Sequence, residues 1–426
     1  MNNDTIIETI MKKALTKKPH IVILGAGFGG LYTFLNLRKL VSAHQADITI
    51  INKTNHFLFT PLLHEVATGG LAHHQVVESI REITYKKGAR VHVAEVRNIN
   101  TSHKTVETDI TSIPYDYLVI ATGARTEFYD VPGASEKTLT LKTLRDAITI
   151  RNRIIDAFER AVDVHDVTER QKLLTFVLVG GGATGVELAA EVSEFFHHAF
   201  KKFLCGKVAP EDVSIHIVTS DSNLLRVFNV GIQKQAYKIL KRVGVQVHTG
   251  VRVTAVDDNG VTLGDGSKID SKLVIWVAGV KPNIPPIDAQ VTSSTSRGRI
   301  LIDGHLRVIG LDQVFALGDV ATFEETFLPM HAQLAVQEAP IVARNISAAM
   351  RNRSLKKFKY QPIGDLVSLG RWQAIGYVWG ILWTGPIAWF IWRTVYLLKF
   401  ASWSKRIKIA VDWTLDIFYP RDTTRA

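Results

Sequence analysis

Two stretches of the chain show a short run of β-branched residues, then spaced glycines, then a helical pattern of apolar positions. In KPHIVILGAGFGGLYTFLNLRKL, the apolar run Ile21–Leu24 is followed by Gly25, Gly27 and Gly30. This order predicts a buried strand, a tight turn and a helix that starts at the turn. The first glycine allows the turn, the second lets the backbone approach a pyrophosphate, and the third packs the helix on the strand.

The second stretch, LLTFVLVGGGATGVELAAEVSEFF, repeats this order further along the chain. Its strand ends at Val179, and its glycines are Gly180, Gly182 and Gly185. In both stretches the amino end of the helix would offer partial positive charge to a phosphate. One such turn is a weak signal, whereas two in the same context favour two dinucleotide-binding sites.

Each stretch is later closed by another strand that runs into a turn of small residues. The first closing segment, YDYLVIATGA, contains Thr122 and Gly123, and the second, SKLVIWVAGV, contains Gly279. Gly123 lies 98 residues after Gly25, and Gly279 lies 99 residues after Gly180. The matching separations predict an internal duplication of one dinucleotide-binding unit. The predicted fold class is therefore α/β, with two Rossmann-like domains.

The acidic residue that commonly binds the adenosine ribose is missing from the end of the second strand in both halves. ADITIINKTNH ends its strand at Asn52, whose amide can still hydrogen-bond a ribose hydroxyl, and VSIHIVTSDSN ends near Thr219. A carboxylate near position 219 would repel a 2′-phosphate, so its absence leaves NADPH open beside NADH. Since no arginine stands at that strand end, NADH is modestly favoured.

Two further segments carry candidate chemistry. In VFALGDVATF, a short apolar strand ends in Gly318 and Asp319. An aspartate delivered to a helix start suits a flavin's ribityl hydroxyls or phosphate, and an ordinary helix cap is the alternative. Downstream, LPMHAQLAVQEAP places Gln333 and Gln337 on one helix face. The pattern alone leaves open whether that face meets water or a pocket.

Composition narrows the classes of protein. The chain has 426 residues, 46% hydrophobic and 21% charged, which predicts a globular protein of two or three domains. Its single cysteine, Cys205, excludes a disulfide framework, a four-cysteine iron–sulfur site and a dithiol redox couple within the chain. The 15 histidines show no metal-ligand spacing, so we expect no metal site.

The net charge of +11 is concentrated near the two ends of the sequence. Residues 371–426 hold eight basic residues against three aspartates, together with seven of the eight tryptophans. Aromatic side chains with interleaved cations are typical of helices that lie in the lipid headgroup layer. Arg393 and Lys399 interrupt the apolar run, so a spanning helix is not expected. A buried helical layer or a dimer interface is the alternative, whereas nucleic acid would favour a more polar groove.

With these pieces placed, the sequence resembles the type II NADH:quinone oxidoreductases, which are single-subunit respiratory flavoproteins that do not pump protons. The resemblance covers about residues 20–420 and rests on HFLFTPLLHEVATGGL, WVAGVKPN, ALGDVA and AQLAVQ. The last motif matches the family's quinone-site signature, AQxAxQ. DLVSLGR and the aromatic-basic segment after it match the family's C-terminal membrane-anchoring helices. Trp372 departs from the family, which usually has lysine there, so a contact with the quinone head is expected to be lost or replaced.

The resemblance implies an enzyme that transfers a hydride from NADH to FAD and two electrons on to a membrane quinone. It implies a peripheral, monotopic protein on the cytoplasmic face of the cell inner membrane, bound to lipid through the aromatic-basic helices. A related flavoprotein reductase with another acceptor is one alternative. A non-enzymatic flavin- and NADH-responsive protein of the membrane surface is another. A homodimer is left open.

The resemblance also implies roles for individual residues. For FAD these are Gly25, Gly27, Gly30, Asn52, Lys53, Thr122, Gly123, Gly318, Asp319 and Ala332. For the nicotinamide cofactor they are Gly180, Gly182, Gly185, Thr219 and Gly279. Gln333 and Gln337 would donate hydrogen bonds near the quinone carbonyls, and Glu187 would assist proton delivery to the quinone. For Glu187, a first-turn glutamate stabilised by the helix dipole is the alternative.

These assignments divide the chain into five expected segments. They are a basic N-terminal tail at 1–19, the first part of the FAD-binding domain at 20–150, the NAD(P)H-binding domain at 151–289, the second part of the FAD-binding domain at 290–345, and the membrane-anchor region at 346–426.

Overall fold

The chain divides into two compact units, each assembled from three separate segments. The computed structural model describes residues 18–201, 204, 207–287, 298–324, 328–415 and 421–425. Unit 1 comprises Met1–Phe57, Ser79–Arg125 and Lys281–Tyr360, and unit 2 comprises Leu58–Glu78, Thr126–Val280 and Gln361–Ala426. Cys205 and all but two residues of the expected N-terminal tail lie outside the described residues.

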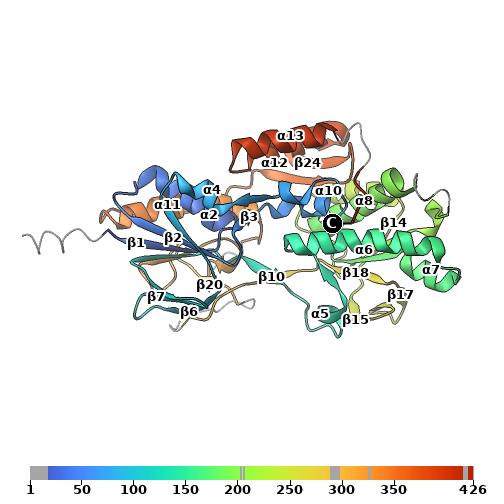
Figure 1. Cartoon of the computed structure of the whole chain (residues 1–426), viewed down its shortest axis with the longest axis horizontal. Coiled ribbons are helices and arrows are strands. Elements are labelled where there is room, and N and C mark those ends of the chain that lie inside the picture. The colour runs from blue at the N-terminus through green and yellow to red at the C-terminus, as the bar shows by residue number, and fades with distance from the viewer. Residues whose placement is uncertain are drawn as a thin grey trace, which may run out of the picture. The chain divides into compact units, whose positions relative to one another are not determined.

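Five parallel strands form the central sheet of unit 1, in the order β21-β9-β1-β2-β5. Their bounds are β1 His20–Leu24, β2 Asp47–Asn52, β5 Ala89–Val93, β9 Tyr117–Ile120 and β21 Val314–Ala316. Strand β1 is a continuous apolar run and is buried along nearly all its length, as is typical of parallel sheets. Helices α2, Phe28–Leu40, and α11, Ala332–Ala349, pack against each other (Figure 1). The turns that follow β1, β9 and β21 therefore lie at one edge of the sheet.

Unit 1 also contains several smaller elements. They are the helix α4 Ile80–Tyr85, the antiparallel sheet of β6 Val96–Asn100, β7 Thr105–Thr108 and β8 Ser112–Pro114, and the parallel pair of β20 Ile300–Leu301 and β22 Ala321–Thr322.

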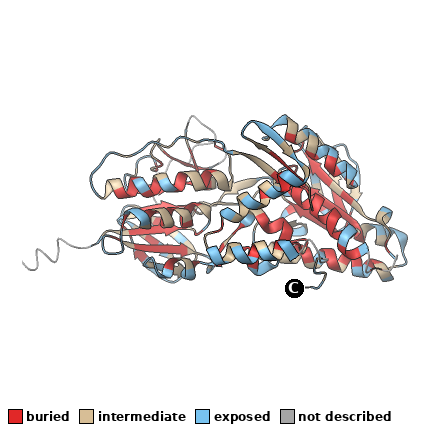
Figure 2. Ribbon diagram, turned by 90° about the horizontal axis from the view of Figure 1, so that it is seen from above, coloured by how far each residue is buried: buried red, intermediate tan, exposed pale blue. Residues whose placement is uncertain are grey.

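Unit 2 contains a second parallel sheet, in the order β11-β18-β12-β13-β14. Its strands are β11 Leu139–Thr140, β12 Thr175–Val179, β13 Ser214–Thr219, β14 Val245–Thr249 and β18 Leu273–Trp276. The order β18-β12-β13-β14 repeats the order β9-β1-β2-β5 of unit 1, which confirms the prediction of two Rossmann-like units. In Figure 2 the strands at the centre of both sheets carry the colour of buried residues.

The segment Thr126–Val280 of unit 2 also contains four longer helices. They are α6 Leu144–Asp163, α7 Val167–Leu173, α8 Ala183–Phe195 and α10 Val230–Arg242. Helix α6 begins with a capping box, because the Thr143 hydroxyl accepts the Asp146 N–H while the Asp146 carboxylate accepts the Thr143 N–H. Helix α8 differs from an ordinary amphipathic helix, since every residue from 185 to 195 is buried, its three glutamates included.

The C-terminal segment of unit 2 starts with strands rather than with the helices expected after DLVSLGR. Strands β23 Gly364–Ser368, β24 Ala374–Val378 and β25 Ile381–Thr384 form an antiparallel sheet. Trp379 and Gly380 both have positive φ, as the tight two-residue turn between β24 and β25 requires. The expected helices start only after this sheet, at Gly385, because the turn residues, rather than the tryptophans, decide the local structure of residues 374–384.

Two helices follow this sheet, α12 Gly385–Leu398 and α13 Trp403–Leu415, and they lie beside each other in Figure 1. None of the helices in the described part of the chain combines the length and the apolar character that crossing a membrane requires.

Candidate functional site

The first glycine turn, between β1 and α2, has the geometry of a dinucleotide cradle. Gly25 has a φ of +89°, and a Cβ there would lie 2.4 Å from the Ala121 carbonyl oxygen. A Cβ at Gly30 would lie 1.8 Å from the Gly25 carbonyl oxygen. A Cβ at Gly27 would meet nothing within 4 Å. The outer glycines are therefore required by packing, while the middle one faces open space, as close approach of a phosphate needs.

The end of β2 supports this turn from the side. The Asn52 Oδ1 accepts a hydrogen bond from the Ala26 N–H at 2.9 Å, and its Nδ2 donates to the Thr54 carbonyl. The amide expected to reach a ribose is thus also engaged in holding the turn itself. Lys53 is largely exposed and pairs with Glu95 at 2.6 Å.

The turn after β9 carries Thr122 and Gly123. Gly123 has a φ of +68°, and its carbonyl accepts the Asn283 N–H at 2.9 Å. The Thr122 Oγ1 is buried and has no hydrogen-bond partner among the described residues. A hydroxyl in this condition is suited to a hydrogen bond with a ligand group.

Gly318 and Asp319 lie in a single 3-10 turn after β21, rather than at the start of a long helix. Gly318 has a φ of +74°, and its N–H donates to the Glu338 carboxyl at 2.6 Å. Burial raises the pKa of Glu338 to about 8. Glu338 belongs to α11, so this bond ties the predicted flavin turn to the helix that carries both glutamines.

Helix α11 begins at Ala332, and His331 caps it by accepting the Leu334 N–H at its Nδ1. Gln333 is half-buried and accepts a hydrogen bond from the Tyr360 hydroxyl at 3.2 Å. Gln337 lies one turn further along the same helix face and is also half-buried. Neither amide is fully exposed to solvent.

The second glycine turn, between β12 and α8, repeats the geometry of the first. Gly180 has a φ of +128°, and a Cβ there would lie 2.7 Å from the Ala278 nitrogen. A Cβ at Gly185 would lie 2.0 Å from the Gly180 carbonyl oxygen, whereas one at Gly182 would meet nothing within 4 Å. The second turn therefore also presents an open middle glycine.

The remaining predicted nucleotide residues lie around this turn. Thr219 is buried at the end of β13, and its hydroxyl accepts the Asp221 N–H at 3.3 Å. Arg226 pairs with Asp221 at 2.9 Å. Gly279 has a φ of +74°, and a Cβ there would lie 2.0 Å from the Tyr129 hydroxyl.

Glu187 belongs to a buried cluster of carboxyl groups that the sequence analysis did not identify. We call it the carboxyl cluster and define it as Glu65 of α3, Leu63–Val66, with Glu187, Glu191 and Glu194 of α8. The three α8 residues follow i, i+4, i+7 spacing, so they share one helix face. This spacing of glutamates among small and apolar residues, in ELAAEVSE, is the sequence pattern from which the carboxyl cluster could have been predicted.

Arg421 supplies a positive charge to the carboxyl cluster from the C-terminal segment. Its guanidinium donates to Glu191 at 2.6 Å and to Glu194 at 3.1 Å. The other Glu194 oxygen accepts the Arg371 N–H. Glu65 accepts a hydrogen bond from the Trp413 Nε1 at 3.0 Å.

The protonation of Glu187 follows from its burial. One of its oxygens accepts the Ser368 N–H at 3.1 Å, and the other lies 3.7 Å from the His64 Nδ1. Burial raises the pKa of Glu187 well above its ordinary value, and the Ser368 N–H only partly opposes this. Burial also raises the pKa of Glu65 to about 7. The raised pKa favours the protonated form of Glu187, which is the form that a proton donor needs.

Trp372 stands in a tight loop before β24, with a φ of +61°. Its ring packs on Trp389 at 4.7 Å between centroids and on Phe390 at 5.7 Å. Two aromatic side chains of α12 thus pack on Trp372, at the position where lysine is usual in the family that the sequence resembles.

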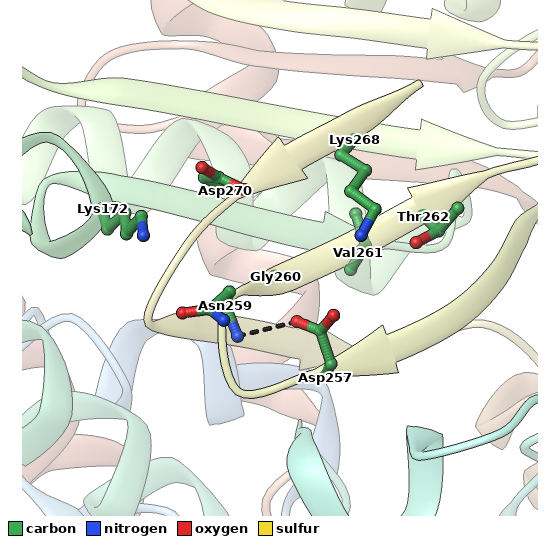
Figure 3. A pocket seen from close by; sticks show the side chains of 8 residues that line it. All are labelled: Lys172, Asp257, Asn259, Gly260, Val261, Thr262, Lys268 and Asp270. Atoms are coloured by element: carbon green, nitrogen blue, oxygen red, sulfur yellow. Dashed lines mark hydrogen bonds between the residues drawn. The ribbon is translucent and has the colours of Figure 1, made fainter. Parts of the chain in front are cut away.

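One hollow in unit 2 lies apart from all of these residues. Figure 3 shows it beside β15 Val253–Asp257, β16 Gly260–Leu263 and β17 Lys268–Asp270. Its lining residues are Lys172, Asp257, Asn259, Gly260, Val261, Thr262, Lys268 and Asp270. The charges of its two lysines and two aspartates cancel. None of the predicted site residues lines this hollow. Among the described residues no group of three or more His, Cys, Asp or Glu is placed to hold a metal ion.

Comparison with known proteins identifies the family. Residues 19–339 match the family described as pyridine nucleotide-disulphide oxidoreductase, and residues 363–422 match the family described as NDH2 C-terminal domain. A type II NADH:quinone oxidoreductase of Mycobacterium tuberculosis is 30% identical over 420 residues, covering 95% of this chain and 89% of that protein. The chain belongs to the type II NADH:quinone oxidoreductases.

Two further comparisons agree with this family. The demethylphylloquinone reductase of Synechocystis is 30% identical over 409 residues, covering 93% of this chain and 96% of that protein. The structure of NDH2 from Plasmodium falciparum in complex with NADH shares the fold, with a TM-score of 0.88 and 23% identity. That match covers 96% of this chain and 100% of the other.

Membership of the type II NADH:quinone oxidoreductases confirms the predicted family, fold class and enzyme class. It also confirms, at the level of the family, NADH oxidation with quinone reduction and the use of FAD and NADH. The roles of individual residues and the domain limits remain predictions. Of the predicted residues, those for FAD and both glutamines lie in unit 1, while those for the nicotinamide cofactor and Glu187 lie in unit 2.

Proposed function

We propose that this protein oxidises NADH and reduces a membrane quinone at the cytoplasmic face of the cell inner membrane, without transporting protons. The observation that carries the proposal is the pair of glycine turns, each with an open middle glycine, in a chain of this family. NADPH stays an alternative to NADH because Thr219, rather than a carboxylate, ends β13.

When bound, FAD supplies the redox chemistry between the nicotinamide and the quinone. We assign its binding to residues 20–150 and 290–345. The proposed contacts are Gly25, Gly27, Gly30, Asn52, Lys53, Thr122, Gly123, Gly318, Asp319 and Ala332. Gly27 gives the pyrophosphate access to backbone N–H groups, and the unpartnered Thr122 hydroxyl offers a further hydrogen bond. Glu338 acts indirectly, because it fixes the Gly318 N–H and so orients the turn that presents Asp319.

The nicotinamide cofactor is assigned to residues 151–289. The proposed contacts are Gly180, Gly182, Gly185, Thr219 and Gly279. Gly182 has the same open surroundings as Gly27, and the amino end of α8 favours a phosphate there. At Gly279 the space beside the turn after β18 is filled by Tyr129, so a residue with a Cβ would not fit there.

Three residues are proposed to act on the quinone. Gln333 and Gln337 lie on one face of α11, where their amides would donate to the quinone carbonyls. Glu187 would donate a proton to a quinone oxygen during reduction. Its burial supports this role, since burial raises the pKa of Glu187 and so favours the protonated carboxyl group that a general acid needs.

We propose that the C-terminal region, residues 346–426, binds the lipid surface. Helix α13 carries an exposed apolar stripe of Trp403, Ile407, Val411 and Leu415, spaced four residues apart. Basic residues lie on the same helix, as expected where an apolar face enters the headgroup layer. A homodimer through the same stripe is the alternative, and light scattering in detergent distinguishes the two.

An anaerobic titration tests the proposed activity. We expect the purified protein to be yellow, to bleach on addition of NADH, and to regain its colour with a soluble quinone. Separate titrations with NADH and NADPH give the nucleotide preference. A flavin that stays oxidised with both nucleotides in the absence of oxygen would contradict the proposal.

The glutamines are tested by separating the two half-reactions. The double change Gln333→Ala with Gln337→Ala should slow reoxidation by quinone by about tenfold or more, because two amide donors are lost, and leave bleaching by NADH unchanged. The matched control is Gln171→Ala, a glutamine of α7 outside the proposed site. Equal slowing of both half-reactions would contradict the assignment.

A further inference from the structure

His64 is a buried histidine beside Glu187 that no assignment above uses. Its Nδ1 lies 3.7 Å from a Glu187 carboxyl oxygen, and both side chains are buried. Its Nε2 is buried and has no hydrogen-bond partner among the described residues. A buried polar atom without a partner calls for an explanation, because desolvation without a hydrogen bond is unfavourable.

The surroundings of His64 keep its ring neutral while Glu187 is protonated. Burial lowers the pKa of His64 to about 4. The indole of Trp392, from α12, lies 6.0 Å from the imidazole and contributes an apolar wall. In a neutral imidazole one nitrogen carries a proton and the other can accept one. Burial therefore favours a resting pair made of a carboxylic acid beside a neutral ring.

Charged and titratable groups face this pair from several elements. Glu191, on α8, favours the charged ring, whereas Arg421, from the C-terminal segment, disfavours it. Glu65, which follows His64 in α3, raises the pKa of Glu187 by its negative charge. Burial raises the pKa of Tyr396, on α12, above its ordinary value, and a negative charge on Glu187 adds to this shift.

Loss of the Glu187 proton changes the balance at His64. A carboxylate at 3.7 Å, in a buried site with low dielectric screening, strongly favours a positive charge on the ring. The two groups therefore titrate as a coupled pair, in which deprotonation of one promotes protonation of the other. The free Nε2 is the atom that can accept the incoming proton.

We propose that His64 is a positioning residue for the quinone reaction and returns a proton to Glu187 after each donation. This inference rests on the proposed function of Glu187. Glu187 gives its proton to a quinone oxygen and becomes a carboxylate. His64 then takes up a proton derived from solvent water at Nε2 and releases the one on Nδ1 to Glu187. No electrons move in these steps. Glu187 ends protonated as it began, whereas the ring ends as the other neutral tautomer, with its proton on Nε2, and must return to the Nδ1–H tautomer before the next turnover.

The test is a double-mutant cycle between His64→Gln and Glu187→Gln, read in each half-reaction. We expect His64→Gln to slow reoxidation by a soluble quinone by about tenfold or more and to change its pH profile, because proton return is impaired. Bleaching by NADH should stay at the wild-type rate. In the Glu187→Gln background, His64→Gln should cause no further slowing, because it acts through Glu187. His73→Gln, an exposed histidine of the same segment, is the matched control and should behave as wild type.

Each outcome of the cycle has a defined meaning. A wild-type rate and pH profile in His64→Gln would overturn the proposal, as would slowing that multiplies with that of Glu187→Gln. A wild-type protein that no quinone reoxidises would instead overturn the proposed function. If Glu187→Gln is reoxidised as fast as the wild type, the assigned role of Glu187 fails, and with it this inference.

A second measurement keeps His64 in place, in case its replacement impairs folding. Infrared difference spectra recorded as quinone reoxidises the protein, with ring-labelled histidine, should show a transient imidazolium signal in the wild type. The signal should be absent from Glu187→Gln, which forms no carboxylate beside the ring. Absence of the signal from the wild type would overturn the proposal.

Discussion

Arg421 brings a positive charge into a part of unit 2 that is otherwise rich in buried carboxyl groups. Its side chain is 14% exposed, and it donates hydrogen bonds to two glutamates and to the Thr68 backbone and hydroxyl. A buried charge that loses its partner remains desolvated without compensation. The residue should therefore matter more for stability than an exposed arginine with one ion pair.

We predict that Arg421→Met lowers the free energy of unfolding of unit 2 by about 3–5 kcal/mol, because Glu191 and Glu194 lose their cation. Arg425→Met is the matched control, since Arg425 is 66% exposed and pairs with Asp156 at 2.6 Å. The control substitution should lower the free energy of unfolding by no more than about 1 kcal/mol. Denaturant unfolding followed by tryptophan fluorescence measures both changes. Equal effects of the two substitutions would contradict the burial argument.

At the scale of elements, the sequence predicts best where local geometry alone decides the structure. Both strand–glycine–helix units were predictable, because a turn with positive φ at Gly25 and Gly180 demands glycine whatever surrounds it. The strands β23 to β25 were not, since a tryptophan-rich run fits a helix or a sheet. The buried face of α8 was missed because its glutamates depend on Arg421, which lies 230 residues from Glu191 along the chain.

Helix α13 gives a prediction at this scale. The double change Trp403→Ser with Ile407→Ser should weaken binding to anionic lipid vesicles by about tenfold or more, since two large apolar side chains leave the stripe. Val167→Ser serves as the control, because Val167 is 80% exposed but lies on α7. Co-sedimentation with vesicles measures the binding. Unchanged sedimentation of the double variant would contradict the lipid-binding role of α13.

On the scale of the whole molecule, both units are discontinuous in sequence. The third segment of unit 2 starts at Gln361 and contains the expected membrane-binding helices. It also supplies Ser368 and Trp413, which hydrogen-bond Glu187 and Glu65. From Gln361 on, the region expected to act as an anchor is therefore part of the folded unit that carries the second glycine turn, whereas residues 346–360 belong to unit 1. Sequence patterns could not predict this, because the contacts join segments that are far apart in the chain.

A chain ended after Tyr360 should therefore lose more than membrane binding. We predict that unit 2 melts at a lower temperature, because its buried glutamates lose their donors, while unit 1 keeps all its segments and retains FAD. Calorimetry and flavin fluorescence measure the two effects. The full-length Trp403→Ser, Ile407→Ser variant is the control and should keep the wild-type melting profile. A truncated chain that melts like the full-length protein would contradict this account.

The bond between Arg421 and Glu191 also orders events during synthesis of the protein. The ribosome delivers β21, which completes the sheet of unit 1, well before it delivers Arg421. Until then, the nascent unit 2 holds its helix α8 glutamates without their cation. Unit 1 can therefore close while translation continues, whereas unit 2 cannot pair its α8 glutamates until the segment that carries Arg421 has been made.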